Sequence, residues 1–173
     1  MVTSRRSRPP DPRLGETGIA VITIPDIRWQ RCDIKSVALI PNVLGKQQAR
    51  EAGAYEAWQI DGAGQVTEGT STNAWIVTAD NAVVTRAADH AILNGVTRLA
   101  VFDIMAREGY RLVERPFTAE EAKAAREAFL TSTTADLLPV VRIDGAPVGD
   151  GTPGPLSRKL RAAYLAHAAS AAI

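Results

Sequence analysis

Lys35 has the residue type and the surroundings of a nucleophilic amine. It follows Ile34 and precedes Ser36 and an apolar stretch over residues 37–40. Lysine usually lies on the surface, and the simplest interpretation of Lys35 is a surface lysine at the end of a strand. If the segment is buried, the amine either reaches out to water or loses its solvation, which lowers its pKa. An amine with a lowered pKa can attack a carbonyl group and form a Schiff base.

Three further stretches carry groups that could bind a charged ligand. Glu68 precedes Gly69 in a polar loop, where a carboxylate is ordinarily exposed to solvent. Residues 95–97 (Gly-Val-Thr) stand at an expected helix start, where free backbone N–H groups and the helix dipole favour an anion. Residues 132–134 supply hydroxyl groups between two expected strands. Ordinary structural interpretations, a capped helix and a threonine-rich loop, fit the last two stretches equally well.

The elements that must position these residues alternate between strands and helices. Strand patterns cover residues 19–24, 55–60, 65–68, 73–78, 82–85, 111–115, 127–131 and 137–143. Helices are expected from a cap at Asn42 to about 52 with Lys46 on the solvated face, from 95 to about 108, from a capping box at Thr118 and Glu121, and from about 155 to 169. Because hairpins and helices are mixed along the chain, we expect an α+β fold with one mixed sheet.

The composition is that of an ordinary globular domain. The chain has 173 residues, of which 46% are hydrophobic and 23% charged, and its net charge of +1 gives no electrostatic reason to expect a nucleic-acid partner. A single cysteine, Cys32, excludes an intrachain disulfide and is typical of a reducing cytoplasm. We find no apolar run near the about 20 residues of a membrane span and no signal core. These features predict a cytoplasmic protein without a membrane partner.

Residues 1–18 are expected to form a mobile arm ahead of a single domain over residues 19–173. The arm is rich in arginine and proline, and like charges and prolines disfavour packing. His90 and His167 are the only histidines and show no spacing typical of metal ligands, so we expect no metal site.

A series of longer motifs follows in the chain: Arg28-Trp29-x-Arg31-Cys32-Asp33-Ile34-Lys35-Ser36, Leu39-Ile40-Pro41-Asn42-Val43-Leu44, Ala49-x-Glu51-x-Gly53-Ala54-Tyr55-Glu56-Ala57, Val66-Thr67-Glu68-Gly69-Thr70-Ser71-Thr72-Asn73, Gly95-Val96-Thr97-Arg98 and Thr131-Ser132-Thr133-Thr134. In this order they resemble the D-amino-acid aminotransferases, enzymes of fold-type IV that bind pyridoxal 5′-phosphate (PLP). The resemblance covers about residues 19 to 166. It implies the large, cofactor-binding domain of that fold, a mixed sheet that forms a pseudo-barrel with packed helices.

The resemblance also implies a role for each site residue. Lys35 would form the Schiff base with PLP and later move the proton of the substrate Cα. Glu68 would hold the proton of the pyridine nitrogen, which lets the ring withdraw electrons. The remaining contacts would be made to the phosphate by Val96, Thr97, Ser132 and Thr133, to the ring by Ser71 and Leu93, and near the Schiff base by Arg28.

The reaction implied is transamination between a D-amino acid and a 2-oxo acid, carried out by a homodimer. Two related enzymes share the lysine and the glutamate, a branched-chain aminotransferase and an aminodeoxychorismate lyase, and either is an alternative. Members of the family carry a smaller N-terminal domain that contributes to the substrate site, and residues 1–18 do not match it. A truncated, non-catalytic domain that binds PLP or dimerises is therefore the alternative from another class.

Overall fold

Apolar and β-branched residues form the strands of one mixed sheet in the computed structural model, which describes residues 11–171. The strand order is β3 (Val66–Gly69), β2 (Glu56–Ile60), β1 (Ile19–Pro25), β8 (Asp136–Ile143), β7 (Glu127–Ser132), β4 (Asn73–Val77), β5 (Val83–Thr85) and β6 (Leu112–Glu114), with β9 (Ala146–Pro147) paired to β8. Strand β1 runs parallel to both of its neighbours, and β5 runs parallel to β6. The other pairs are antiparallel, so the expected α+β class with a mixed sheet is confirmed.

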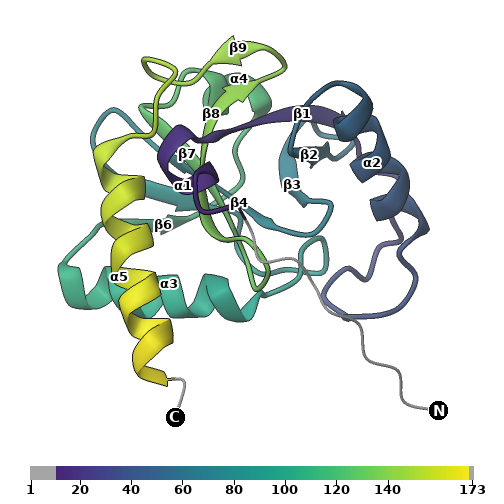
Figure 1. Ribbon diagram of the computed structural model, residues 1–173. Coiled ribbons are helices and arrows are strands. Elements are labelled where there is room, and N and C mark those ends of the chain that lie inside the picture. The colour runs from purple at the N-terminus through teal and green to yellow at the C-terminus, as the bar shows by residue number, and fades with distance from the viewer. Residues whose placement is uncertain (1–10, 172–173) are drawn as a thin grey trace.

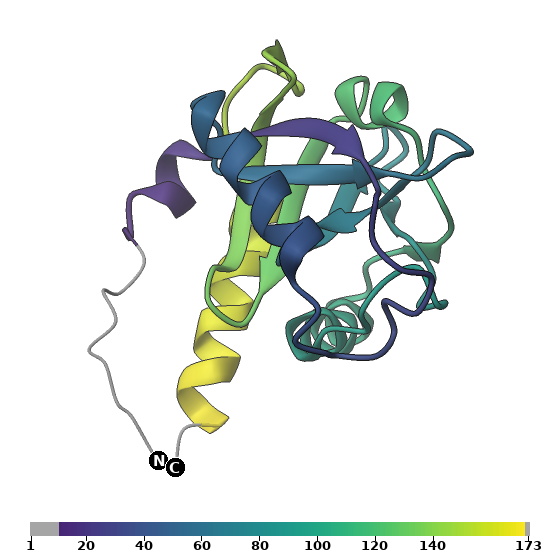
Figure 2. The same cartoon turned by 90° about the vertical axis from the view of Figure 1, so that its right-hand side faces the viewer.

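Helices cover the sheet from different sides (Figures 1 and 2). They are α1 (Leu14–Thr17), α2 (Ile40–Glu51), α3 (Val96–Glu108), α4 (Ala119–Lys123) and α5 (Pro155–Ala171). Helix α2 packs on β1 and β2, whereas α3 and α5 pack on each other and on β7. In Figure 1, α2 therefore lies across the molecule from α3 and α5.

The core is buried on both faces of the central strands. Along β4, Ala74 and Ile76 belong to one apolar cluster, and Trp75 and Val77 belong to another. The second cluster lies under α3 and α5, where Trp75 stacks on Phe129 with ring centroids 5.3 Å apart. A strand buried on both faces reads as a continuous apolar run. This explains why the sequence of β4 shows no alternation of polar and apolar residues.

Most of the expected elements are confirmed. The short elements α1 and β9 were not expected, and the other differences lie at the ends of elements. Helix α2 begins at Ile40, with Pro41 in its first turn, and not at a cap on Asn42. The Asn42 side chain instead donates a hydrogen bond of 2.6 Å to the Thr70 carbonyl. Helix α3 ends at Gly109, whose φ of 72° is the left-handed conformation that favours glycine.

The expected mobile arm falls partly outside the described residues. Residues 1–10 lie outside them, so the prediction stays a prediction for that part. Residues 14–17 form the short helix α1, which contacts β8 and α5. Gly15 in this helix is buried, so residues 14–17 are packed against the domain.

Helix α4 provides a test of the expected capping box. The Thr118 hydroxyl accepts a hydrogen bond of 3.0 Å from the Glu121 backbone N–H, as predicted. We expect Thr118→Ala to lower the free energy of unfolding by about 1 kcal/mol, because an orphan N–H donor of the first turn loses its acceptor. Urea unfolding measures this change. Thr118→Ser, which keeps the acceptor, is the control and should lose clearly less.

Within residues 11–171, none of the helices combines the length and the apolar character that crossing a membrane requires.

Candidate functional site

All the residues predicted for the site line one cavity of about 430 Å³. Four segments that are distant in sequence bring them together: the loop after β1, the end of β3, the start of α3 and the end of β7. The volume is within the range of ligand sites in proteins. The predicted residues in its lining are Arg28, Lys35, Glu68, Ser71, Leu93, Val96, Thr97, Ser132 and Thr133.

Lys35 lines this cavity, but its surroundings differ from the expected ones. The segment between β1 and α2 is a loop with turns, and Lys35 is exposed within it. Ile34 is 45% exposed and Val37 96% exposed, so this stretch is not buried, and Lys35 is a surface lysine as its simplest interpretation expected, although in a loop and not at the end of a strand. The apolar residues of this loop do not face the core of the described chain. Lys35 therefore remains the candidate for a reactive amine because it lines the cavity and because its motif resembles that of the D-amino-acid aminotransferases.

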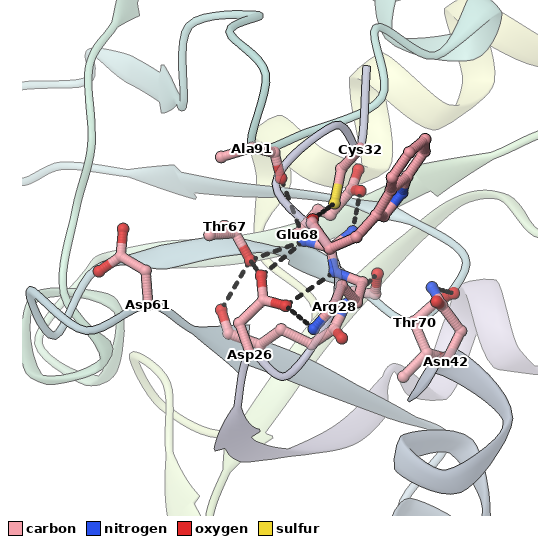
Figure 3. A network of polar contacts seen from close by, with 12 residues as sticks. Asp26, Arg28, Cys32, Asn42, Asp61, Thr67, Glu68, Thr70 and Ala91 are labelled. Carbon is pink, nitrogen blue, oxygen red and sulfur yellow. Dashed lines mark hydrogen bonds and ion pairs between the residues drawn. The ribbon is translucent and has the colours of Figure 1, made fainter. Parts of the chain in front are cut away.

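Glu68 is buried on strand β3, not exposed in a polar loop (Figure 3). Its Oε1 forms an ion pair with Arg28 Nη1, and its Oε2 accepts hydrogen bonds of 3.1 Å from the Asn73 side chain and the Leu93 backbone N–H. Burial, the strongest influence, raises the pKa of Glu68 to about 7, while the Arg28 charge and the hydrogen bonds act in the opposite direction. The carboxyl group is therefore poised to exchange a proton near neutral pH.

Arg28 lies beside Glu68 and is fixed by several acceptors. Its guanidinium donates to both oxygens of Asp26, to the Thr67 hydroxyl and to the Ala91 carbonyl. Burial lowers the pKa of Arg28, but hydrogen bonds and charges from Asp26 and Glu68 outweigh it and raise the pKa overall. Arg28 is a permanent positive charge at the cavity wall.

The start of α3 offers hydrogen-bond donors to the same cavity. Helix α3 begins after Gly95, and no side chain caps its first turn, so the backbone N–H groups of that turn remain open to a ligand. Val96 is exposed and Thr97 is buried. The other stretch expected to bind an anion lies at the end of β7, where Thr133 is exposed and Ser132 Oγ accepts a hydrogen bond of 3.0 Å from Ala135 N–H. Both stretches line the same cavity.

A second buried carboxylate supports the floor of the site. Glu56 is fully buried on β2 and accepts hydrogen bonds from the hydroxyls of the 70–72 turn and from its own neighbour, Ala57 N–H. Lys46 Nζ lies 3.4 Å from Glu56 Oε2 and donates to the Tyr55 carbonyl at 2.6 Å. Lys46 lines the cavity, so the expectation that it lies on a solvated helix face is wrong.

Sequence reasoning missed the residues that support the predicted ones. Asn73 and Thr67 stood in the quoted motif around Glu68, and Glu56 stood in another, but no role was given to them. Their positions inside motifs were the available indication. Asp26 stands two residues before the motif that begins at Arg28, and its partner Thr67 is distant in sequence, so no local pattern indicated their contact.

Cys32 lies at the edge of the same cavity and is partly buried. Burial is the strongest influence and raises the pKa of its thiol, and the Sγ–H donates to the Trp29 carbonyl at 3.1 Å. A raised pKa lowers the fraction of thiolate, so Cys32 is not suited to act as a nucleophile.

Known proteins share long stretches of this sequence. The family model described as "Amino-transferase class IV" matches residues 1–143. The D-alanine aminotransferase of Bacillus licheniformis is 45% identical over 148 residues, which are 86% of this chain and 52% of that protein. The D-alanine aminotransferase of Listeria monocytogenes (strain 10403S) is 38% identical over 165 residues, 95% of this chain and 56% of that protein.

Solved structures give the same picture of the fold. The PLP form of the branched-chain amino acid aminotransferase from Thermobaculum terrenum has a TM-score of 0.80 and 28% identity, over 91% of this chain and 53% of that one. The branched-chain aminotransferase from Thermoproteus uzoniensis with norvaline has a TM-score of 0.79 and 29% identity, over 88% and 52%. The chain thus spans about half the length of the relatives it matches.

Proposed function

This chain belongs to the class IV aminotransferase family, whose fold-type IV architecture it shares, and on that basis we propose that it is the cofactor-binding half of a PLP-dependent aminotransferase. The proposed reaction exchanges an amino group between a D-amino acid and a 2-oxo acid. One observation carries the proposal: an amine, a buried carboxyl group and an uncapped helix start line a single cavity, at Lys35, Glu68 and α3.

The residues present fit the cofactor. A phosphate needs backbone donors, and the start of α3 offers them without a competing side-chain cap. A pyridine nitrogen needs an acid in a water-poor place, and Glu68 is a buried carboxyl group on the same cavity. An aldehyde needs a reachable amine, and Lys35 provides one. The residues that would hold PLP are therefore those of the four cavity segments.

When bound, PLP supplies an aldehyde for the substrate amine and a ring that withdraws electrons from the substrate Cα. The chain's own residues would do the rest. Lys35 would attach the cofactor covalently and, once released, carry the Cα proton as acid and base. Glu68 would share a proton with the ring nitrogen, and Arg28 would hold Glu68 in place through their ion pair. Val96, Thr97, Ser132 and Thr133 would bind the phosphate, while Ser71 and Leu93 would orient the ring.

The choice of a D-amino acid rests on sequence similarity. The D-alanine aminotransferases described above are 38% and 45% identical to this chain, whereas the two branched-chain aminotransferases of known structure are 28% and 29% identical. The branched-chain reaction remains the second candidate because those structures share the fold. An aminodeoxychorismate lyase stays a weaker alternative, since none of the matches described above carries that name.

The test of substrate class needs a complete enzyme. We would fuse the part of the Bacillus licheniformis D-alanine aminotransferase that this chain does not match to the chain, and measure turnover of D-alanine and L-leucine with 2-oxoglutarate. Faster turnover of D-alanine is expected. Preference for L-leucine would favour the branched-chain candidate, and PLP binding without any turnover would favour the non-catalytic one.

Without that complement, the chain is expected to show little or no aminotransferase activity. It spans about half of its relatives' length, and loss of substrate orientation can remove about 7–11 kcal/mol of catalytic advantage. Steady-state assays of the purified chain with D-alanine and 2-oxoglutarate test this. Turnover at a rate usual for enzymes would contradict the prediction.

Thr97→Ala and Thr133→Ala are each expected to weaken PLP binding. Each variant removes one hydroxyl from the proposed phosphate site, and a hydrogen bond to a charged group is worth about 1.5–3 kcal/mol. Fluorescence titration with PLP measures the affinity. Thr134→Ala is a matched control, because Thr134 is an exposed threonine in the same turn that does not line the cavity. Equal affinity in all three variants would show that the phosphate site is misplaced.

The homodimer and the cytoplasmic location stay predictions of the resemblance and of the single cysteine.

A further inference from the structure

The ion pair of Arg28 and Glu68 has a third member, Asp26, which does not line the cavity. The Asp26 carboxylate accepts hydrogen bonds from Arg28 at three places: the backbone N at 3.1 Å, Nε at 2.9 Å and Nη2 at 2.7 Å. Its side chain is only 11% exposed, and that of Arg28 is 5% exposed. Such a bidentate contact fixes the plane of the guanidinium as well as its position.

Thr67 closes this arrangement. Its hydroxyl lies 2.8 Å from Asp26 Oδ2 and 3.1 Å from Arg28 Nη2, and it also reaches the Gln59 carbonyl at 3.1 Å. Because Thr67 precedes Glu68 on β3, the strand that carries Glu68 also holds the support of its partner (Figure 3). Asp26 and Thr67 thus hold Nε and Nη2 of Arg28, and the remaining Nη1 forms the ion pair with Glu68.

The charges of this cluster do not cancel. Two carboxylates, Asp26 and Glu68, face one guanidinium, Arg28, so the cluster carries one surplus negative charge when both acids are ionised. The other groups close to Glu68 are the neutral amide of Asn73, the Leu93 N–H and the Cys32 thiol, and Lys35 lines the same cavity. A buried surplus charge is costly unless a positive group or a proton neutralises it.

We propose that Asp26 is a positioning residue that fixes Arg28 and gives the Arg28–Glu68 pair the surplus negative charge needed to keep a proton on the ring nitrogen of bound PLP. This inference rests on the proposed function. Arg28 alone would neutralise Glu68 and leave no charge for the ring. With Asp26 present, one guanidinium faces two carboxylates, and the positive charge of the protonated ring nitrogen would neutralise the surplus negative charge.

The pKa values of the two acids agree with these different roles of Asp26 and Glu68. Burial is the strongest influence on Asp26, but Arg28 and Thr67 outweigh it and lower the pKa of Asp26 below its usual value. Burial raises the pKa of Glu68 to about 7, and the charge of Asp26 contributes in the same direction. Asp26 therefore remains ionised, and the cluster takes up its proton at Glu68 or at a base next to it.

The first experiment compares the ring nitrogen of bound PLP in the wild-type chain and in Asp26→Asn. Asparagine keeps the shape and removes the charge. Nitrogen-15 NMR of ring-labelled PLP reports the protonation of that atom directly, which a purely structural role of Asp26 would not alter. We expect the pKa of the ring nitrogen to fall by at least about one unit in Asp26→Asn. Asp61→Asn is the matched control: Asp61 also pairs with an arginine, Arg86, but outside the cavity.

A second measurement needs no cofactor. Carbon-13 NMR of the Glu68 carboxyl group gives its pKa in the cofactor-free chain. This pKa should fall in Asp26→Asn and stay unchanged in Asp61→Asn, because of these two acids it is Asp26 whose charge raises the pKa of Glu68. An unchanged Glu68 titration in a folded Asp26→Asn chain would overturn the inference. If that variant does not fold, the wild-type chain decides: protonation of Asp26 over the pH range in which Glu68 titrates would overturn it equally.

A Glu68→Gln arm separates this inference from the proposed function. A ring nitrogen that responds to Glu68→Gln but not to Asp26→Asn would overturn the role of Asp26 alone. If neither substitution changes the protonation of the ring nitrogen, or if the wild-type chain binds no PLP, both this inference and the proposed function are overturned.

Discussion

Lys35→Ala is expected to abolish the covalent attachment of PLP to this chain while leaving the fold intact. Lys35 lies in an exposed loop, so truncation of its side chain removes no core packing. The backbone N–H groups at the start of α3, which we propose bind the phosphate, are unaffected, and PLP should still bind non-covalently. Borohydride reduction of the wild-type complex followed by peptide mapping should find the cofactor on Lys35, and the absorbance of the bound cofactor should change in the variant.

Lys46→Ala is the matched control, because Lys46 is the other lysine in the cavity lining. Its amine is engaged by the Tyr55 carbonyl and by Glu56. Lys123 and Lys159 are paired with acids away from the cavity. We therefore expect all reducible label on Lys35 in both the wild-type chain and Lys46→Ala. Label on Lys46, or a reducible complex that survives in Lys35→Ala, would remove Lys35 from its proposed role.

Glu68→Gln should keep PLP bound and slow transamination in the fused enzyme by about two to three orders of magnitude. The neutral amide cannot stabilise a protonated ring nitrogen as a carboxylate does, and removing one such electrostatic contact typically costs about 2.7–4 kcal/mol of barrier. Steady-state turnover of D-alanine gives the rate, and titration with PLP gives the affinity. A rate equal to that of the unmodified enzyme would exclude Glu68 from the mechanism.

The same variant should also change how stability depends on pH in the cofactor-free chain. The pKa of Glu68 is raised from 4.5 to about 7 in the folded state, mainly by burial. Between these two values the folded chain binds more protons at Glu68 than the unfolded chain, so the free energy of unfolding falls as pH rises. Glutamine does not titrate. Urea unfolding at several pH values should therefore show that the free energy of unfolding falls less between pH 4.5 and 7 in Glu68→Gln than in the wild-type chain.

Local patterns in the sequence were enough to predict most of the helices and strands. The helix from Val96 to Glu108 begins after Gly95 and ends at Gly109, and the Thr118 cap forms as its motif indicates. These features depend on residues within one turn of each other, so no distant contact is needed to specify them. Strand β4 was also predictable, because the continuous apolar residues 74–77 indicate a strand that is buried on both faces.

Burial of individual charged residues was not predictable in this way. The apolar neighbours of Lys35 left open whether it is buried, and the structure shows that its loop is exposed. Glu68 looked exposed because of its polar neighbours, yet it is buried, with the side chains of Arg28 and Asn73 and the Leu93 backbone N–H against its carboxyl group. Neighbours in sequence say little about exposure in a loop or a short strand, where the packing of distant segments decides it.

The sequence by itself determined the family and the α+β class, because whole motifs kept their order, and the same motifs contained the predicted residues that line the cavity. Only the tertiary structure decided how those residues are charged and supported. Asp26, Arg28, Thr67 and Glu68 come together because β1 and β3 lie on either side of β2. The resulting polar contacts join residues about 40 positions apart. Their energies depend on burial and on distances of about 3 Å, and both quantities follow from the tertiary structure and cannot be derived from the order of the residues alone.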